Sequence, residues 1–275
     1  MEEKITKIYK WSNLMRNKII DLTYKAGRNG GHMGGALSSV EIFATLYSCV
    51  ANIDPSNKED EQRDRIIPSK GHCVLSYYTA LNLAGFISDN LLESYETNGT
   101  SMWGHPTRNL ERGIEFSAGS LGLGASFAVG VAKACKKKGL TNRIFLLLGD
   151  GECNEGIVWE ALSFAAHHNL NNLTVILDRN RLQLDAPTKD ILNMESFEDK
   201  FKAFNFHVNT IDGHDAGQLI EALSERFDIP NVVIADTVKG KGISFLENNP
   251  ACHHYVLNEK QYNQAKEENQ QYANQ

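Results

Sequence analysis

The sequence has few cysteines and no long apolar run. Its 275 residues include five cysteines, an odd number, and no CxxC pattern. This composition argues against a disulfide scaffold and against a zinc site built from cysteines. No apolar stretch approaches the roughly 20 residues that span a membrane, and the charged N-terminus lacks the apolar core of a signal peptide. We therefore expect a cytoplasmic protein that does not act at a membrane.

An excess of charge of one sign is also missing. The net charge is −6, and basic and acidic residues alternate along most of the chain. Neither nucleic acid nor an anionic membrane is therefore expected as a partner, and a phosphate ligand needs local geometry and a metal to hold it. The composition is that of an ordinary globular protein. We expect a single domain over residues 1–275, with a helical segment at 1–26 and a polar tail at 255–275.

The apolar runs of the chain alternate with helical patterns. Unbroken runs such as RIFLLLGD and NLTVILDRN are typical of strands buried on both faces. The alternation predicts an α/β fold, a doubly wound and mostly parallel sheet with helices on both faces. Strands are expected within residues 64–72, 143–150, 172–180, 206–213 and 231–238, and the main helices within 1–26, 40–50, 73–86, 119–137 and 155–170.

The stretch LLLGDGECNEG places a carboxylate between two glycines where a strand meets a helix. Asp150 ends one strand, and Asn180 ends the next, one strand-helix-strand crossover later. If the strands are neighbours, the two side chains share one edge of the sheet. A carboxylate and an amide oxygen suit Mg²⁺, and the glycines leave room for a phosphate near a helix N-terminus. The alternative is that Asp150 only caps the helix.

Other phosphate-binding loops fit this chain less well. A dinucleotide fingerprint that starts at Gly149 and Gly151 requires a third glycine where Asn154 stands, and no GxxxxGK[ST] pattern occurs. Metal-assisted binding of a diphosphate is therefore the preferred interpretation of the acidic turn.

At these residues the sequence resembles the transketolase family. GDGECNEG followed by DRNRLQLD is similar to the thiamine diphosphate and magnesium motif, and GHMGGALS, SKGH, WGHP, GSLGLG and TVKGKG occur in the family's order. The match covers nearly the whole chain and is closest to the N-terminal half of transketolases split into two chains. The resemblance implies thiamine diphosphate and Mg²⁺ as cofactors and sugar phosphates as substrates. It also implies a separate C-terminal, pyrimidine-binding subunit in an α2β2 assembly.

The resemblance also assigns roles to individual residues. Asp150, Asn180 and the carbonyl of Leu182 would bind Mg²⁺, and Glu155 would link paired active sites across the subunit interface. The catalytic set implied by the family is His32, His72, His105, His253 and Glu155. The set implied to contact the cofactor is His72, Gly119, Ser120, Leu121, Gly122, Gly151, Glu152, Asn180 and His253.

Four of the nine histidines stand beside glycines or a proline, in loops where they can reach a ligand. Imidazoles suit the proton transfers of ketol transfer because their pKa lies near neutrality. Considered alone, each of these histidines is more simply explained as a structural residue. Their positions within the family's motifs are what favours a role at the site. His254 is a weaker rival to His253. The remaining four, His167, His168, His207 and His214, are expected to be structural, with the first two in the middle of a helix.

Some positions depart from the family pattern. Met33 and Ser120 replace prolines that are common in the family, changes we expect to be conservative for cofactor binding. Cys252 replaces a frequent tryptophan and His254 a frequent glycine, which makes the assignment around His253 less direct and points to an altered acceptor pocket.

The family's second domain supplies the glutamate that activates the cofactor, and residues 1–275 offer no place for it. We therefore expect no ketol transfer by this chain alone. The alternatives are the α subunit of a 2-oxo acid dehydrogenase, half of a 1-deoxyxylulose-phosphate synthase, or a non-catalytic assembly subunit. TVKGKG, WGHP and the four histidines favour transketolase over the dehydrogenase.

Overall fold

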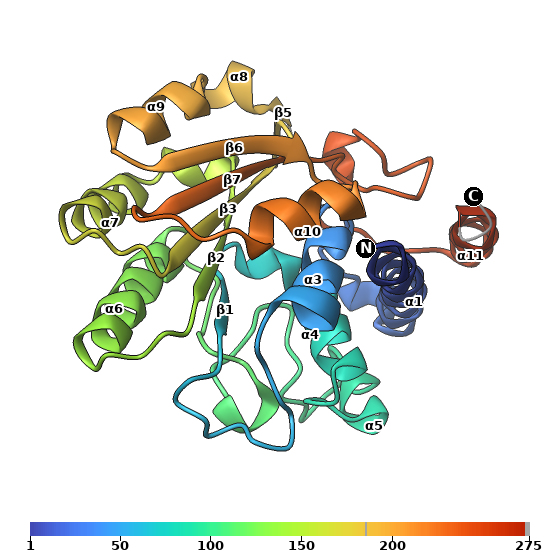
Figure 1. Ribbon diagram of the computed structural model, residues 1–275. Coiled ribbons are helices and arrows are strands. Elements are labelled where there is room, and N and C mark those ends of the chain that lie inside the picture. Colours follow the sequence, from blue (N-terminus) through green and yellow to red (C-terminus); the bar gives the residue numbers. More distant parts are fainter. Residues whose placement is uncertain (185, 273–275) are drawn as a thin grey trace.

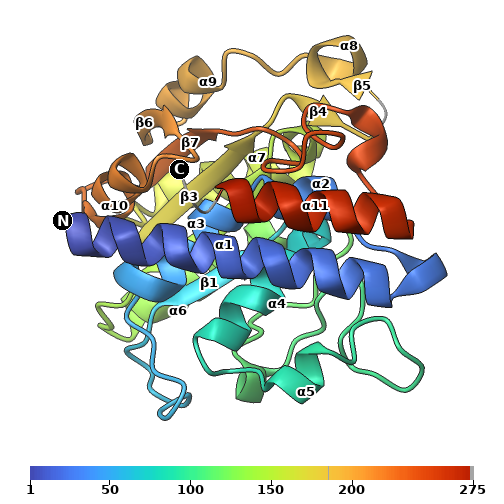
Figure 2. The same ribbon diagram turned by 90° about the vertical axis from the view of Figure 1, so that its right-hand side faces the viewer.

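The two ends of the chain form a pair of helices. The computed structural model describes residues 1–184 and 186–272. Helix α1 (Glu2–Lys25) is one helix where the sequence predicted one or two, and the polar tail contains helix α11 (Glu259–Tyr272). They lie side by side (Figure 2), and the rings of Tyr24 and Tyr262 stack with centroids 4.2 Å apart. The tail is therefore packed against α1, and residues 273–275 lie outside the described part.

Five strands form one parallel sheet in the order β1-β2-β3-β7-β6 (Figure 1). Every residue of the neighbouring strands β2 and β3 is buried, as their unbroken apolar runs predict. A short antiparallel ribbon, β4 with β5, follows the third strand. The strands are β1 (Arg65–Pro68), β2 (Ile144–Gly149), β3 (Leu173–Arg179), β4 (Leu182–Gln183), β5 (Ala186–Pro187), β6 (His207–Asp212) and β7 (Asn231–Asp236).

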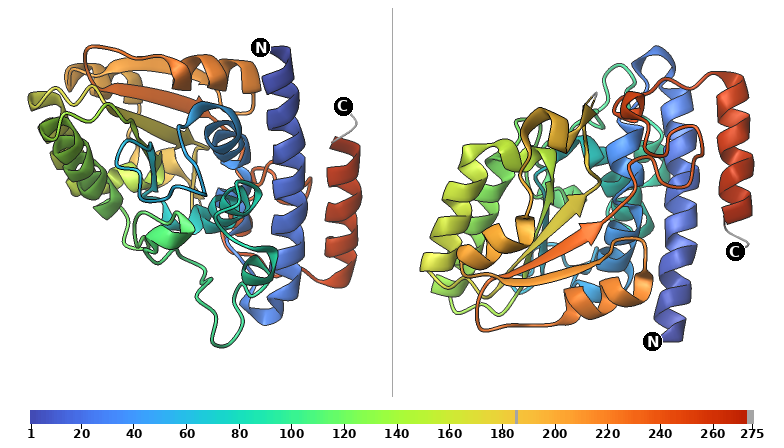
Figure 3. Two further views of the ribbon diagram at one scale, coloured as in Figure 1. Left: turned by 60° about the horizontal axis from the view of Figure 1, so that its bottom comes forward. Right: turned by 90° about the horizontal axis from the view of Figure 1, so that it is seen from above.

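Helices cover both faces of the sheet, and each face has its own apolar core. Along β2, Phe145 and Leu147 belong to the core shared with α1, whereas Leu146 and Leu148 belong to the opposite core. This alternation is the period of two that a strand buried on both faces requires. Figures 1 and 3 show the two helical layers, which confirms the doubly wound fold. One layer holds α3 (Val40–Thr45), α4 (Val74–Leu83) and α10 (Ala216–Ser224), and the other α6 (Leu123–Lys137), α7 (Gly156–His167) and α9 (Phe197–Ala203).

Two helix predictions need correction. The helix expected from residue 119 begins at Leu123, because Gly119 (φ 152°) and Gly122 (φ 81°) make a turn in a region of φ that favours glycine. His167 and His168 were predicted in the middle of a helix, but they end α7 and cap it. Short helices complete the chain: α2 (Met33–Leu37), a π-helical turn (Leu46–Val50) that continues α3, α5 (Asp89–Leu92) and α8 (Thr188–Leu192).

Candidate active site

Asp150 and Asn180 lie at the carboxyl edge of the sheet, directly after the neighbouring strands β2 and β3. Both side chains are buried. The Asp150 carboxylate accepts hydrogen bonds from the backbone N–H of Gly151 (2.8 Å) and of Arg181 (2.5 Å). It therefore joins the ends of the two strands. As a cap it serves only the short 3-10 turn Gly151–Asn154, because α7 starts later and has Glu155 as its N-cap.

A cavity of about 190 Å³, here called the inner cavity, opens at this edge. The structure brings most of the predicted site residues to its wall. They come from the ends of β1, β2 and β3 and from the loops before α2, before α6 and after β7. The predicted residues that line it are His32, His72, His105, Gly119, Leu121, Asp150, Gly151, Glu152, Asn180, Leu182 and His253.

Three predicted residues do not line the inner cavity: Ser120, Gly122 and Glu155. Ser120 is exposed to solvent between Gly119 and Leu121, which do line the cavity. Gly122 is structural, since a Cβ there would come within 2.6 Å of the Ile157 side chain. Glu155 is exposed at the start of α7, a position open to another chain. The cofactor and catalytic roles of these three stay predictions.

Glu152 lines the inner cavity, and its hydrogen bonds go to the protein. Its carboxylate accepts hydrogen bonds from the Ser69 hydroxyl (2.5 Å) and from the backbone N–H of Gly122 (2.7 Å) and Gly149 (3.1 Å). Burial raises its pKa. These bonds hold the loop before α6 against the ends of β1 and β2. The arrangement gives Glu152 a scaffolding role, and its predicted contact with the cofactor stays a prediction.

The predicted metal ligands meet at one place and offer only oxygen. The side-chain oxygen of Asn180 accepts from the backbone N–H of Leu182 (3.1 Å), and the carbonyl of Leu182 accepts from the Lys239 ammonium (3.1 Å). Burial, together with the charge of Asp178, raises the pKa of Asp150 to about 7. A buried carboxylate in this state is stabilised by a divalent cation, and this all-oxygen donor set suits Mg²⁺. Among the described residues no cluster of three His, Cys, Asp or Glu side chains could hold a metal.

Four histidines form a cluster over the inner cavity. The ring of His32 lies 5.1 Å from that of His105 and 5.4 Å from that of His253, and the rings of His72 and His253 are 5.1 Å apart. Burial lowers the pKa of His32 to about 3 and that of His72 well below its usual value. These two imidazoles are therefore neutral at pH 7, able to donate and to accept. Within the described chain, the buried Nδ1 of His32 has no hydrogen-bond partner, as expected of a group that meets a ligand.

The sequence prediction missed two lysines of the inner cavity, Lys70 and Lys239. Lys70 is fully buried, pairs with Asp178 and donates to the carbonyl of Gly35 (3.1 Å). Lys239 lies between the carbonyl of Leu182 and the ring nitrogen Nδ1 of His253, at 3.4 Å from the latter. Two ammonium groups beside a glycine turn form a suitable place for a diphosphate. Both lysines stand inside the motifs SKGH and TVKGKG, which was the available signal.

His214, predicted to be structural, connects the core to the loop that carries Lys239. Its Nε2 accepts from the backbone N–H of Val238 (2.9 Å), so its Nδ1 carries the proton and donates to Glu41 (2.9 Å). Burial alone would raise the pKa of Glu41, but the charge of Arg16 lowers it to about 2. The ionised Glu41 therefore holds His214 in one tautomer.

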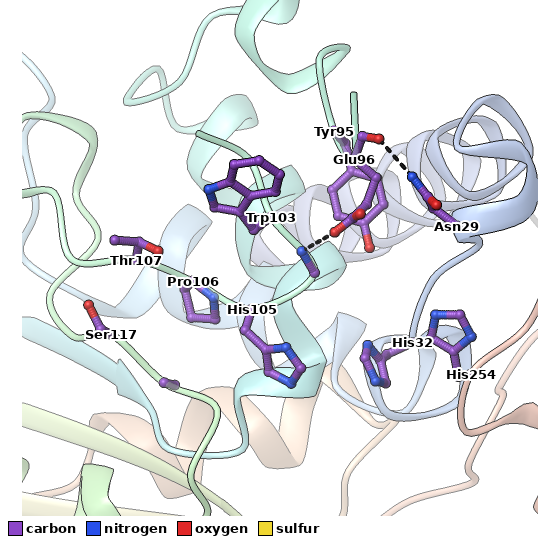
Figure 4. A pocket seen from close by; sticks show the side chains of 12 residues that line it. Asn29, His32, Tyr95, Glu96, Trp103, His105, Pro106, Thr107, Ser117 and His254 are labelled. Atoms are coloured by element: carbon purple, nitrogen blue, oxygen red, sulfur yellow. Dashed lines mark hydrogen bonds between the residues drawn. The ribbon is translucent and has the colours of Figure 1, made fainter. Parts of the chain in front are cut away.

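A second pocket of about 480 Å³, here called the outer pocket, adjoins the inner cavity. The two share His32 and His105. Figure 4 shows His32, His105 and His254 on one side of the outer pocket, with Glu96 and Trp103 beyond them. The rival histidine, His254, lines the outer pocket and not the inner cavity, and its ring lies 4.9 Å from that of His32.

Comparison with known families identifies the chain. Residues 10–272 match the family described as the transketolase, thiamine diphosphate binding domain. The chain belongs to the transketolase family. The expected cofactor, thiamine diphosphate with Mg²⁺, agrees with this membership and with the oxygen ligands at Asp150 and Asn180.

The relatives of this transketolase domain include proteins named as subunits and longer transketolases. It is 41% identical to one of the subunits of the apulose-4-phosphate transketolase of Actinobacillus succinogenes, with 90% of each chain covered. It is 37% identical to the 6-deoxy-6-sulfo-D-fructose transketolase subunit SqwG of Clostridium sp., with 96% of this chain and 97% of the relative covered. Human transketolase is 32% identical over 92% of this chain, which spans only 40% of that protein.

A solved structure gives the same relation. Transketolase from Leishmania mexicana superposes with a TM-score of 0.87 at 27% identity, covering 96% of this domain and 41% of that chain. The domain therefore spans about two fifths of the single-chain transketolases and nearly all of the relatives named as subunits. These relatives favour transketolase over the dehydrogenase α subunit.

Proposed function

We propose that this chain, as a single domain over residues 1–275, is the N-terminal subunit of a two-chain transketolase. The reaction is transfer of a two-carbon ketol unit from a ketose phosphate to an aldose phosphate. The observation that carries the proposal is the meeting of the Asp150 and Asn180 oxygens with four histidines at one sheet edge. The coverage of relatives named as subunits supports the division into two chains.

The residues of the inner cavity hold the cofactor in this proposal. Asp150, Asn180 and the carbonyl of Leu182 bind Mg²⁺, and Gly151 with Lys239 faces the diphosphate. When bound, thiamine diphosphate supplies the carbon that carries the two-carbon unit. Lys70, held by Asp178, adds a fixed positive charge under the same site.

The histidines act on the sugar. His32, His105 and His253 donate hydrogen bonds to the sugar oxygens and exchange protons with its hydroxyl groups as charge develops there. Burial lowers the pKa of His32 and of His105, which keeps both rings neutral at pH 7. That state is necessary, because an imidazolium cannot accept a proton. His72 faces the cofactor side, where its half-buried ring packs over Gly35.

The partner in this proposal is a C-terminal, pyrimidine-binding subunit in an α2β2 assembly. Glu155 is exposed at the start of α7 and would link paired sites across the interface. We further propose a cytoplasmic location, in keeping with five free cysteines, four of them buried. Within residues 1–184 and 186–272, no helix has the length and apolar character that crossing a bilayer requires.

Substrate class tests the proposed reaction against its nearest rivals. The assembled complex, with thiamine diphosphate and Mg²⁺, is offered either xylulose 5-phosphate with ribose 5-phosphate or 2-oxo acids such as pyruvate. Turnover of the sugar phosphates alone supports transketolase. Decarboxylation of the 2-oxo acids would contradict it in favour of a dehydrogenase component. A complex that binds no thiamine diphosphate would contradict it in favour of an assembly role.

A further inference from the structure

The outer pocket has an unusual charge for a site that receives sugar phosphates. Its wall, as far as the described residues form it, contains no lysine or arginine and one carboxylate, that of Glu96. The other polar groups are imidazoles, hydroxyls and the amide of Asn29. This wall suits a neutral, hydroxylated molecule better than an anion.

Glu96 is held firmly in this wall. One carboxylate oxygen, Oε1, accepts from the backbone N–H of Gly104, and the backbone carbonyl accepts from the Asn29 amide (3.1 Å). Figure 4 shows both hydrogen bonds. The other carboxylate oxygen, Oε2, has no hydrogen-bond partner among the described residues. The side chain is half-buried, so its charge is only partly screened by water.

Two further side chains give the outer pocket the features of a sugar site. Trp103 presents an exposed indole ring at the wall, an apolar surface of the kind that packs against the C–H face of a sugar. His254 brings a polar ring where the family often has glycine, next to His32. The outer pocket thus combines the apolar face of Trp103 with hydrogen-bonding groups and the single negative charge of Glu96.

We propose that Glu96 is a specificity-determining residue of the outer pocket, which receives the hydroxyl-bearing part of the aldehyde acceptor. Its free carboxylate oxygen accepts hydrogen bonds from sugar hydroxyls, and its charge disfavours an acceptor whose phosphate lies on this wall. An acceptor's phosphate is therefore bound less tightly by the natural chain than by a variant that lacks this charge. This inference rests on the proposed ketol transfer.

The test compares two acceptors that differ only in the phosphate, glyceraldehyde and glyceraldehyde 3-phosphate. With xylulose 5-phosphate as donor and the assembled complex, kcat/KM is measured for the natural chain and for Glu96→Gln. Glutamine keeps an oxygen for the N–H of Gly104 and removes the charge. We expect kcat/KM for glyceraldehyde 3-phosphate, divided by kcat/KM for glyceraldehyde, to rise about tenfold in the variant, mainly through a lower KM for the phosphorylated acceptor. A tenfold change corresponds to about 1.4 kcal/mol.

Salt and a matched variant separate charge from a loss of structure. In the natural chain, higher ionic strength should raise the same ratio, because salt screens the repulsion, and Glu96→Gln should remove this dependence. Glu93→Gln changes a nearby exposed carboxylate outside the outer pocket and should leave the ratio unchanged. An unchanged ratio in Glu96→Gln, or none of the salt effect in the natural chain, overturns the inference. Inactivity of the natural complex with both acceptors overturns the proposed function as well.

Discussion

Lys70 and Asp178 form an ion pair in which neither side chain is exposed to solvent. Asp178 also accepts hydrogen bonds from the hydroxyls of Ser38 (2.7 Å) and Thr237. Burial alone would raise the pKa of Asp178, but the charge of Lys70 lowers it below its usual value. Lys70 lines the inner cavity, and the pair connects the end of β1 to the end of β3, so it belongs to both the core and the site.

We predict that Asp178→Asn destabilises the fold strongly. The change leaves the Lys70 ammonium buried without a countercharge, which typically costs about 3–5 kcal/mol. Urea unfolding followed by circular dichroism measures the loss. The matched control is Glu61→Gln, which breaks the exposed pair with Lys138 and should change the unfolding free energy little. Equal, small losses in both variants would contradict a tightly coupled buried pair.

Asp150→Asn should separate cofactor binding from stability. The substitution removes a metal ligand, so binding of thiamine diphosphate in the presence of Mg²⁺ should weaken roughly a hundredfold or more. It also removes a buried carboxylate whose pKa is raised to about 7, which offsets the loss of one of the two backbone N–H hydrogen bonds that the carboxylate accepts, so the unfolding free energy without cofactor should change little. Calorimetric titration of the assembled complex checks the first part. Asp190→Asn, on the exposed helix α8, is the control, and an unchanged affinity in Asp150→Asn would remove the metal assignment.

His214→Ala should weaken cofactor binding although His214 does not line the inner cavity. The change removes the acceptor for the N–H of Val238 and so loosens the loop that carries Lys239. We expect the Kd for thiamine diphosphate to rise about tenfold, with partial rescue by His214→Gln, whose amide can also accept. His207→Ala, which loses a contact with Asn231 far from the cavity, should not change the Kd. Equal effects of the two alanine variants would indicate a general loss of stability.

Acid should destabilise the fold through the histidine cluster. The pKa of His32 is about 3 in the folded chain and 6.5 when the ring is solvated. Between pH 6.5 and pH 3 the unfolded chain therefore binds a proton at His32 that the folded chain does not bind. The free energy of unfolding is highest above pH 6.5 and decreases as the pH falls toward 3. The loss is about 1.4 kcal/mol per pH unit for each such histidine. Urea unfolding at pH 7.5 and pH 5 should show a smaller loss for His32→Asn than for the exposed control His167→Asn, and equal losses would contradict the burial argument.

The strands could be predicted from the sequence because a strand that is buried on both faces requires an unbroken apolar run. The runs at β2 and β3 are apolar at nearly every position, and their order along the chain fixes parallel neighbours. Asp150 and Asn180 could be placed together for the same reason. The predicted start of α6 was wrong because the small residues of this glycine-rich stretch are compatible with a helix as well as with a turn. The positive φ angles of Gly119 and Gly122, which the sequence does not reveal, exclude the helix there.

The lysines of the inner cavity could not be found from local pattern. Lys70 is buried only because Asp178, 108 positions later, neutralises it, and a charged residue in a turn ordinarily suggests exposure. Lys239 depends similarly on His214 and on the carbonyl of Leu182. Asp185, within the motif DRNRLQLD, lies outside the described residues. Long-range charge pairing has no sequence period, so the structure is needed to reveal it.

The most direct test of the central claim is a coupled ketol-transfer assay with each chain alone and with both together. The assay contains xylulose 5-phosphate, ribose 5-phosphate, thiamine diphosphate and Mg²⁺, and the second chain is the candidate C-terminal subunit. The account predicts no turnover by this chain alone and turnover in the mixture, lost again when the mixture carries Asp150→Asn. Robust ketol transfer by this chain alone would contradict it.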